Sequence, residues 1–444
     1  MIFHDALKSR SHPSLMISGR DIVYISSIEW NFLWQGHQEI ARRLAQAGNR
    51  VLYLENTGVR SPGVRDAARV AFRLKRWARA LLSGGVREVA PNIYVCSPLV
   101  LPPFGSRLSR EMNRRFFLRF VRRTARKLGI RRPLVWTYLP NDTTLDLIRS
   151  LDRSGLVYYC VADFTQLTPS ADRLRATERE LVAMCDVVFT NCSALANAFA
   201  PTNPNSHVFP FGVNLDAFPL EEVTTRAANA DAAPEDMRAK DSDADDDDDA
   251  RLLPKPIIGY VGGMHRHVDF DLIREMAKAR PSWSWVCVGA LQADTTGLAE
   301  LPNVHMVGQK RHDELVDYIR LFDVCIVPYV NSIYTETVVP TKINEYLAMG
   351  KPVVSTDLPT VCEFNEEHRV LITAPARAED FLRAIESALS LPKDQATIRH
   401  RRRVAELGNW HTRLESMSRL IEESLGIKAD APAEEVARVA ASTR

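Results

Sequence analysis

A lysine and a glutamate one helical turn apart form the most informative pair in this chain. Lys342 and Glu345 lie in a segment that opens at Pro340 and closes at Gly350, just before an apolar run. Proline suits the first turn of a helix and glycine its end, so we expect Lys342 near a helix N-terminus, where unpaired backbone N–H groups favour phosphate. Glu345 follows on the same face. A cation for a diphosphate and a carboxylate for ribose hydroxyls would then face one cleft, as a nucleotide-sugar site requires.

A pair of glycines earlier in the chain gives a second, weaker phosphate signal. Gly262 and Gly263 follow the apolar run 257–261 and precede Arg266. Paired glycines let backbone N–H groups approach a phosphate, and a guanidinium can bind it through two hydrogen bonds. We expect these residues to contact the diphosphate together with Lys342.

A carboxylate just beyond another apolar run is the best candidate for acid–base chemistry. Asp163 follows residues 156–161, and ligands of parallel sheets bind beyond the carboxyl ends of the strands. A carboxylate at this place could take the proton from an acceptor hydroxyl. The alternative is that Asp163 only caps the N-terminus of a helix.

Large aromatic side chains follow the first apolar run. Trp30 and Trp34 lie in a predicted loop after residues 21–27, and His37 opens the next predicted helix. Flat aromatic faces suit sugar or lipid-linked sugar acceptors. Alternatively, the two rings only fill the bottom of the cleft and His37 caps its helix. Glu29, in the same loop, is a further candidate base.

Together these segments resemble GT-B glycosyltransferases, in particular family four and its relatives. The run 340–354, Pro-Thr-Lys-Ile-Asn-Glu-Tyr-Leu-Ala-Met-Gly-Lys-Pro-Val-Val, is similar to their donor-binding signature, in which the glutamate at the position of Glu345 contacts the ribose. A second carboxylate usually stands where Thr337 stands here, with Glu336 beside it. The resemblance covers most of the chain and includes bacterial transferases of exopolysaccharide and teichuronic acid synthesis and, more distantly, the xanthan glucuronosyltransferase. An amphipathic helix that merely ends before a core strand is the alternative for this run.

The resemblance also implies roles for residues outside that run. Lys310 follows a predicted strand at 304–307, where relatives contact the nucleotide base, although a plain surface turn explains it equally well. His37 is a second candidate base, because inverting relatives use a histidine after the first strand. In relatives, two adjacent acids often follow the strand that corresponds to 156–161, whereas Ala162 takes the first of these positions here.

Composition and patterning set the fold class. At 444 residues and 45% apolar, the chain is long enough for two domains with separate cores. Apolar runs alternate with helical periodicity in two successive series, the first ending with a strand expected at 208–211. The pattern predicts an α/β chain of two doubly wound, Rossmann-like domains that face each other across a cleft, as the GT-B resemblance implies.

The domain boundaries follow from an unusually acidic segment. Residues 221–250 hold 12 acids against 3 bases, a composition that cannot bury a core. We expect an acceptor-binding domain, a disordered linker, a donor-binding domain, helices that cross back to the first domain and a disordered tail, at residues 1–220, 221–255, 256–395, 396–427 and 428–444.

Basic helices indicate a membrane surface as a partner. Residues 60–132 hold 19 Lys and Arg against 3 Asp and Glu, and predicted helices at 65–82 and 107–128 place apolar residues such as Phe116 on one stripe. Basic faces gain about 1 kcal/mol per charge near anionic lipid. The alternative is that the stripes pack on the sheet and the arginines are only solvated. Nucleic acid is not expected as a partner, since these helices match no base-reading module.

The resulting expectation is a cytoplasmic glycosyltransferase, held peripherally on the inner face of the plasma membrane. It would transfer a sugar from a nucleoside diphosphate to a lipid-linked or polysaccharide acceptor in exopolysaccharide or cell-surface glycan synthesis. No cofactor is expected beyond this co-substrate, and seven scattered cysteines without zinc-like pairs argue against a metal. No apolar run suits a membrane span or a secretory signal. The alternative outside enzymes is a catalytically inactive nucleotide-sugar-binding scaffold of a polysaccharide assembly complex.

Overall fold

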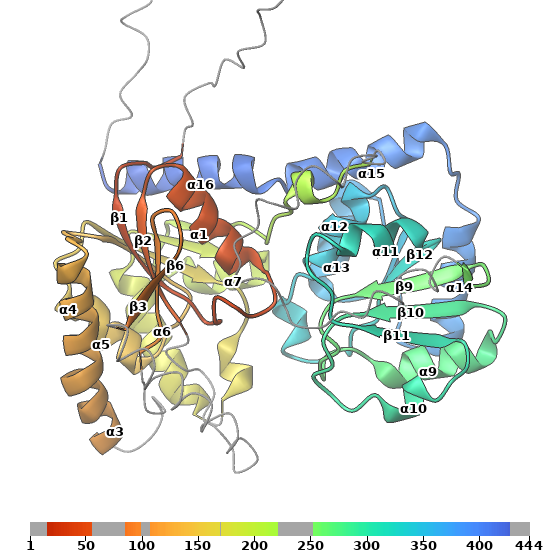
Figure 1. Cartoon of the computed structure of the whole chain (residues 1–444), viewed down its shortest axis with the longest axis horizontal. Coiled ribbons are helices and arrows are strands. Elements are labelled where there is room, and N and C mark those ends of the chain that lie inside the picture. Colours follow the sequence, from red (N-terminus) through yellow and green to blue (C-terminus); the bar gives the residue numbers. More distant parts are fainter. Residues whose placement is uncertain (1–15, 56–84, 99–106, 169, 221–251, 427–444) are drawn as a thin grey trace, which may run out of the picture.

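Two sheets of mainly parallel strands organise the chain, one in each half (Figure 1). The computed structural model describes residues 16–55, 85–98, 107–168, 170–220 and 252–426. The predicted helix at 65–82, the tail at 428–444 and all of the predicted linker except residues 252–255 lie outside these ranges. The two-domain, doubly wound α/β architecture predicted from the sequence is confirmed.

The first sheet has the strand order β3-β4-β2-β1-β5-β6-β7-β8. Its strands are β1 (Asp21–Ile25), β2 (Arg50–Leu54), β3 (Val86–Ala90), β4 (Ile93–Cys96), β5 (Leu134–Thr137), β6 (Gly155–Cys160), β7 (Val187–Thr190) and β8 (Ser206–Val208). Central strands such as β5 and β6 are buried at every position, as expected for parallel strands covered on both faces. Among the described strands, only β3 is antiparallel to its neighbour.

One predicted strand of this sheet is displaced. The sequence places the last strand at 208–211, whereas β8 ends at Val208. Pro210 has no backbone N–H to donate to a ladder, so the chain leaves the sheet before it. The edge strand β3 was not predicted from the sequence, because its half-exposed residues do not form an apolar run.

Helices cover both faces of the first sheet. One face carries α1 (Gly36–Gln46) and the last helix, α16 (Trp410–Ser424), which share a core with the strands. The other face carries a second set of helices: α3 (Arg107–Met112), the π-helical turn η2 (Asn113–Phe117), α4 (Leu118–Lys127), α5 (Asp142–Ser150), α6 (Ala171–Met184) and α7 (Ser193–Phe199).

The π-helical turn changes the basic helix from its predicted form. The sequence places Phe116 on one apolar stripe with Phe117 and Val121, but the side chain of Phe116 is 64% exposed, while Phe117 and Val121 are buried. A π turn holds more residues than an α turn, so it shifts the phase of the apolar stripe. That part of the prediction is wrong, and an aromatic ring faces outward among arginines.

The second sheet is fully parallel in its described strands, with the order β11-β10-β9-β12-β13-β14. Its strands are β9 (Ile257–Val261), β10 (Ser284–Val288), β11 (Val304–Gly308), β12 (Val324–Val327), β13 (Val353–Thr356) and β14 (Ile372–Ala374). Its helices are α9 (Phe270–Ala279), α10 (Thr296–Ala299), α11 (Leu315–Leu321), α12 (Lys342–Ala348), α13 (Pro359–His368) and α14 (Ala378–Leu389).

Two consecutive helices join the domains. Figure 1 shows α15 (Gln395–Leu407) beside the second domain and α16 continuing along the first. Four residues of α16 belong to a core cluster of the first sheet: Trp410, Leu414, Met417 and Ile421. Within the described ranges, no helix has both the length and the hydropathy needed to cross a membrane.

We expect α16 to stabilise the first domain through Trp410. This ring is 3% exposed, and a Cβ on Gly36 would lie 2.9 Å from it, so α1 and α16 pack closely. Trp410→Ala should lower the free energy of unfolding by about 3 to 5 kcal/mol, the usual cost of removing a buried tryptophan. The exposed Arg419 on the same helix provides the control, with an expected effect of Arg419→Ala within about 0.5 kcal/mol. Denaturant unfolding measures both, and equal effects would contradict a packing role for Trp410.

Candidate active site

The carboxyl ends of the two sheets meet between the domains. A Cβ on Gly263, after β9, would lie 3.6 Å from Cδ1 of Leu33, in the loop after β1. The loop after β6 donates the N–H of Asp163 to Oγ1 of Thr337 at 3.2 Å. Loops that follow four strands of the two sheets, β1, β6, β9 and β12, therefore border one interdomain site, at the edge where parallel sheets bind ligands.

The ammonium of Lys342 is buried among aromatic rings at this site. The residue is 7% exposed, and its Nζ donates to the Tyr329 hydroxyl at 2.6 Å. The same nitrogen lies 5.0 Å from the ring centre of Tyr260 and 4.7 Å from that of Tyr329, distances at which ring faces attract cations. None of these described partners is an anion.

The glycine turn after β9 lies directly against this lysine. A Cβ on Gly262 would be 2.9 Å from Cε of Lys342 and one on Gly289 only 1.9 Å from the Gly262 carbonyl oxygen. Gly262 and Gly289 also have φ angles of 140° and 153°, which side chains rarely adopt. The structure thus brings Gly262, Gly263 and Lys342 together, and glycine is required for that approach.

Two other residues predicted to bind the sugar nucleotide, Arg266 and Lys310, are more exposed than Lys342. Arg266 is exposed, and its Nε donates to Nε2 of His267 at 3.4 Å. Lys310 is half-buried, with its Nζ 5.6 Å from the ring centre of Tyr318 on α11. Among the described residues, no group of three His, Cys, Asp or Glu is arranged to hold a metal ion.

The carboxylates of the donor segment differ in exposure. Glu345 is half-buried on α12, one turn after Lys342. Glu336 is exposed on the short helix η8 (Thr335–Thr337). Thr337, at the position where relatives carry a carboxylate, instead contacts the first domain.

Asp163 caps the short helix η3 (Phe164–Leu167). Its Oδ1 accepts hydrogen bonds from the backbone N–H and hydroxyl of Thr165 at 3.0 and 2.5 Å, and its Oδ2 accepts one from Nε2 of Gln166 at 3.0 Å. A carboxylate offers about four lone-pair sites, so one remains open on Oδ2. The capping role is present in the structure, and the role as a base stays a prediction.

Two buried side chains that the sequence did not single out hold the aromatic loop. Gln38 donates from Nε2 to the carbonyl oxygens of Glu29 and Trp30 at 3.4 and 3.3 Å. Glu55, at the end of β2 and 2% exposed, accepts the Trp30 N–H at 2.8 Å. The sequence signals that could have identified them are the place of Glu55 directly after the apolar run of β2 and the capping-box spacing of Gln38 three residues after Gln35.

The two tryptophans of this loop pack against each other and remain half-buried. The ring centres of Trp30 and Trp34 are 5.9 Å apart in an edge-to-face arrangement, and Trp30 also meets Tyr53 at 5.2 Å. Nε1 of Trp34 donates to Oε2 of Glu39 at 3.1 Å. The rings are thus held firmly by the domain while part of each stays accessible.

His37 has an apolar environment that disfavours a role as base. It is 2% exposed, and its ring centre lies 3.9 Å from that of Tyr138. Burial lowers the pKa of His37 to about 3, so the ring is neutral at physiological pH. Nε2 lies 3.0 Å from the Ser27 hydroxyl, whereas Nδ1 has no partner among the described residues.

Glu178 on α6 is a titratable group that sequence reasoning missed. Its Oε1 accepts a hydrogen bond from the Tyr158 hydroxyl at 2.5 Å and lies 3.8 Å from the Cys160 thiol. Burial, with a smaller contribution from the nearby Asp163 charge, raises the pKa of Glu178 from 4.5 to about 7. Near neutral pH this carboxyl therefore holds a proton part of the time.

The raised pKa of Glu178 predicts a pH-dependent stability. The folded protein binds this proton more tightly than the unfolded chain, so the stabilising contribution is present below pH 4.5 and is lost as the pH rises to about 7. Relative to the wild type, Glu178→Gln should gain up to about 3 kcal/mol in unfolding free energy across that window. The exposed Glu180 on the same helix is the control, and Glu180→Gln should show no such trend in denaturant titrations at each pH. Parallel profiles for wild type and Glu178→Gln would contradict the assignment.

Comparisons with known proteins agree with this geometry. Residues 255–390 match the family described as "Glycosyl transferases group 1". The chain is 33% identical over 159 residues to TuaH of Bacillus subtilis (strain 168), described as a teichuronic acid biosynthesis glycosyltransferase. That stretch spans 35% of this chain and 40% of TuaH.

Solved structures are similar over nearly the whole length. Sucrose-phosphate synthase from Thermosynechococcus elongatus superposes with a TM-score of 0.64 at 18% identity, over 92% of this chain and 100% of that one. HepE of Anabaena in complex with UDP-glucose gives a TM-score of 0.59 at 14% identity, over 92% and 99%. At such identities the likeness shows the fold. The chain therefore has the GT-B fold, and it is similar to bacterial glycosyltransferases of group 1, as its motifs indicate.

Proposed function

We propose that the protein transfers a sugar from a nucleoside diphosphate to a lipid-linked or polysaccharide acceptor in exopolysaccharide or other cell-surface glycan synthesis. The observation that carries this proposal is the buried ammonium of Lys342, whose described partners supply no negative charge and which adjoins a glycine turn. A diphosphate would supply that charge through strong, charge-assisted hydrogen bonds. Because the similar HepE was solved with UDP-glucose, UDP is the first nucleotide to test.

In the proposed reaction an acceptor hydroxyl oxygen bonds to the anomeric carbon of the sugar while the bond from that carbon to the diphosphate breaks. The carboxylate of Asp163 takes the hydroxyl proton through its open lone pair, and the nucleoside diphosphate leaves with the bonding electrons. Lys342 and Arg266 stabilise the charge that develops on the leaving group, in place of a divalent metal.

The remaining predicted residues surround these groups. We propose that Glu345 binds the ribose hydroxyls and that Lys310 lies near the nucleotide base. The half-buried faces of Trp30 and Trp34 would contact the acceptor. Glu29 is the next candidate base after Asp163, since the low pKa of His37 makes that imidazole a weak proton acceptor.

Different mutations should affect nucleotide binding and the catalytic step. Lys342→Ala and Glu345→Ala should each weaken UDP binding by about 1 to 3 kcal/mol in a calorimeter, the cost of a lost charged hydrogen bond. Asp163→Asn keeps the shape and should spare UDP binding, but it should lower the release of UDP from UDP-glucose by about 100-fold or more. Lys278→Ala, at an exposed lysine of the same domain, is the control for charge alone.

Three outcomes would overturn parts of this proposal. Full-strength UDP binding by Lys342→Ala and Glu345→Ala would remove the donor site. A fully active Asp163→Asn would transfer the base assignment to Glu29. If the wild type binds UDP but does not release UDP from UDP-glucose, the alternative is favoured, namely a catalytically inactive scaffold that binds nucleotide sugars.

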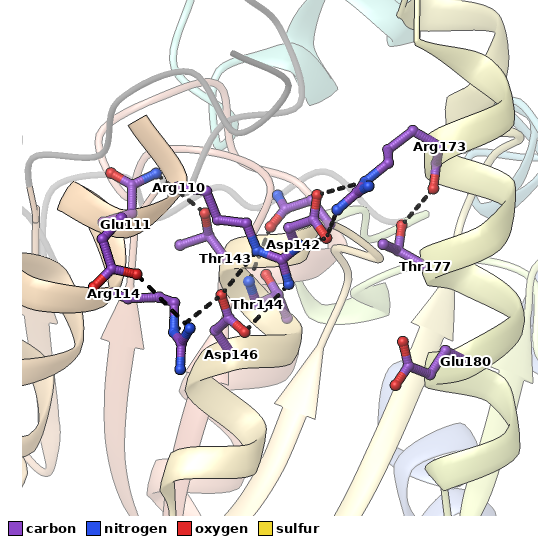
Figure 2. A network of polar contacts seen from close by, with 12 residues as sticks. Arg110, Glu111, Arg114, Asp142, Thr143, Thr144, Asp146, Arg173, Thr177 and Glu180 are labelled. Carbon is purple, nitrogen blue, oxygen red and sulfur yellow. Dashed lines mark hydrogen bonds and ion pairs between the residues drawn. The ribbon is translucent and has the colours of Figure 1, made fainter. Parts of the chain in front are cut away.

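The basic helix predicted to contact the membrane uses some of its arginines for ion pairs within its own domain. Figure 2 shows Arg110 and Arg114 turned toward α5, where Arg110 pairs with Asp142 at 3.2 Å and with Asp146 at 3.4 Å. Arg173 of α6 joins the same network, 2.9 Å from Asp142. Arg110 therefore fixes the helix to its own domain and cannot be counted among the cations that face lipid.

The outer face of the helix carries arginines that differ from Arg110 in having no ion pair with described residues. Among these exposed arginines are Arg115, Arg119, Arg122 and Arg123, and the exposed ring of Phe116 belongs to the same helix. Arg119 and Arg123, with Arg126 and Lys127, line a shallow hollow of about 590 Å³. We propose that this face binds anionic headgroups, which would hold the protein on the cytoplasmic face of the plasma membrane.

Charge reversal should test that contact. Arg119→Glu with Arg123→Glu should weaken sedimentation with anionic vesicles at least about tenfold, since each basic residue near the surface contributes about 1 kcal/mol. Arg399→Glu with Arg403→Glu, at the same spacing on an exposed face of α15, is the matched control. Added salt should weaken wild-type binding through screening. Equal binding to neutral vesicles, or equal loss in both variants, would exclude this face as the contact.

A further inference from the structure

Hydrogen bonds that cross between the domains converge on Thr337. Its Oγ1 accepts the N–H of Asp163 at 3.2 Å and donates to the carbonyl oxygen of Tyr334 at 3.3 Å. Its own carbonyl oxygen accepts a bond from Nδ2 of Asn191 at 3.1 Å. One residue of the second domain thus holds two segments of the first.

Asn191 completes the link from the first domain. It follows β7 and is 2% exposed, and its Nδ2 also donates to the carbonyl oxygen of Val161 at 2.6 Å. Because both neighbours of that nitrogen are carbonyl oxygens, the orientation of the amide is settled. Asn191 therefore ties the end of β6, just before Asp163, to Thr337.

We propose that Thr337 and Asn191 are positioning residues that dock the Asp163 loop onto the donor-binding domain. The inference rests on the proposed function, in which Asp163 is the base. The hydroxyl of Thr337 fixes the backbone of Asp163, and the capping bonds to Thr165 and Gln166 then fix its carboxylate relative to that backbone. The position of the base relative to the donor is consequently set by contacts between the domains.

The chemistry of this link suits a contact that forms and breaks. It consists of hydrogen bonds, as does a second crossing in which Nδ2 of Asn344 donates to the carbonyl oxygen of Phe211 at 3.2 Å. Oδ1 of Asn191 is buried without a partner among the described residues. Burying an unpaired oxygen costs free energy, and this cost disfavours the arrangement in which the two domains are docked. Val339, two residues after Thr337, also packs against the apolar core of the first domain, so the contact is only partly polar. Interfaces between domains of one chain commonly permit relative motion.

Thr337→Val is the test, since it removes the hydroxyl and keeps the shape. Amide hydrogen exchange at Asp163 should become at least about tenfold faster, because its N–H loses its acceptor. The release of UDP from UDP-glucose should fall about tenfold, while the Kd for UDP stays within about twofold. Thr337→Ser restores the hydroxyl and should restore both rates. Thr295→Val, at a half-buried threonine whose side chain makes no capping hydrogen bond, is the matched control.

The outcomes separate this inference from the proposed function. Wild-type exchange at Asp163 in Thr337→Val would overturn the inference, whatever the activity. An inactive Asp163→Asn beside a fully active Thr337→Val would also overturn it and leave the base assignment intact. A fully active Asp163→Asn would instead remove the proposed base, and the exchange measurement would still decide whether Thr337 holds the loop.

Discussion

The packing of α12 against the end of β9 is the constraint on which the donor side of the molecule depends. Two residues one turn apart on α12 reach this strand end: the Tyr346 hydroxyl accepts the Val261 N–H at 2.7 Å, and the Lys342 side chain lies beside Gly262. Tyr260 adds a hydrogen bond to the Gly263 carbonyl oxygen at 3.1 Å. An ammonium enclosed in this way interacts with ring faces and a phenol, so an anion that reaches the glycine turn meets a charge already desolvated.

The same helix is linked to the other domain through the end of the chain. Arg401 donates to the carbonyl oxygen of Gly350 at 3.1 Å and Arg402 to that of Ala348 at 2.8 Å, which satisfies acceptors at the end of α12. The helix that carries these arginines, α15, leads into α16, whose Trp410 is buried in the first domain. The element that places the donor lysine is thus connected to the domain that holds Asp163 by consecutive helices as well as by Thr337.

Most of the fold could be predicted from the sequence because its elements carry local signals. The interior strands are uninterrupted apolar runs, and α12 is bounded by a proline and a glycine. Most of the failures lie where tertiary context decides. β3 forms because it pairs with the free edge of β4. β8 ends shortly before Pro210, which has no backbone N–H to donate, and Phe116 faces outward because a π turn shifts the phase of the apolar stripe. β3 and the π turn do not change the hydrophobic pattern enough to be visible without the neighbouring elements, whereas Pro210 is a local signal that the prediction of a strand at 208–211 did not take into account.

The residues of the candidate site also fall into those with a local sequence signal and those whose role depends on distant parts of the chain. Lys342 and the glycine turn have signals within a few residues, whereas Thr337 meets Asp163 across 174 positions, and the sequence marks Thr337 only for the carboxylate it lacks. The environment of Glu178 likewise depends on Tyr158 and Asp163, which belong to other segments. For Asp163 itself, the sequence leaves a helix cap and a base as alternatives, but the geometry makes them compatible. Three capping bonds hold the carboxylate in one orientation and leave a lone pair on Oδ2. A base must be held in this way before it can meet a hydroxyl at hydrogen-bond distance.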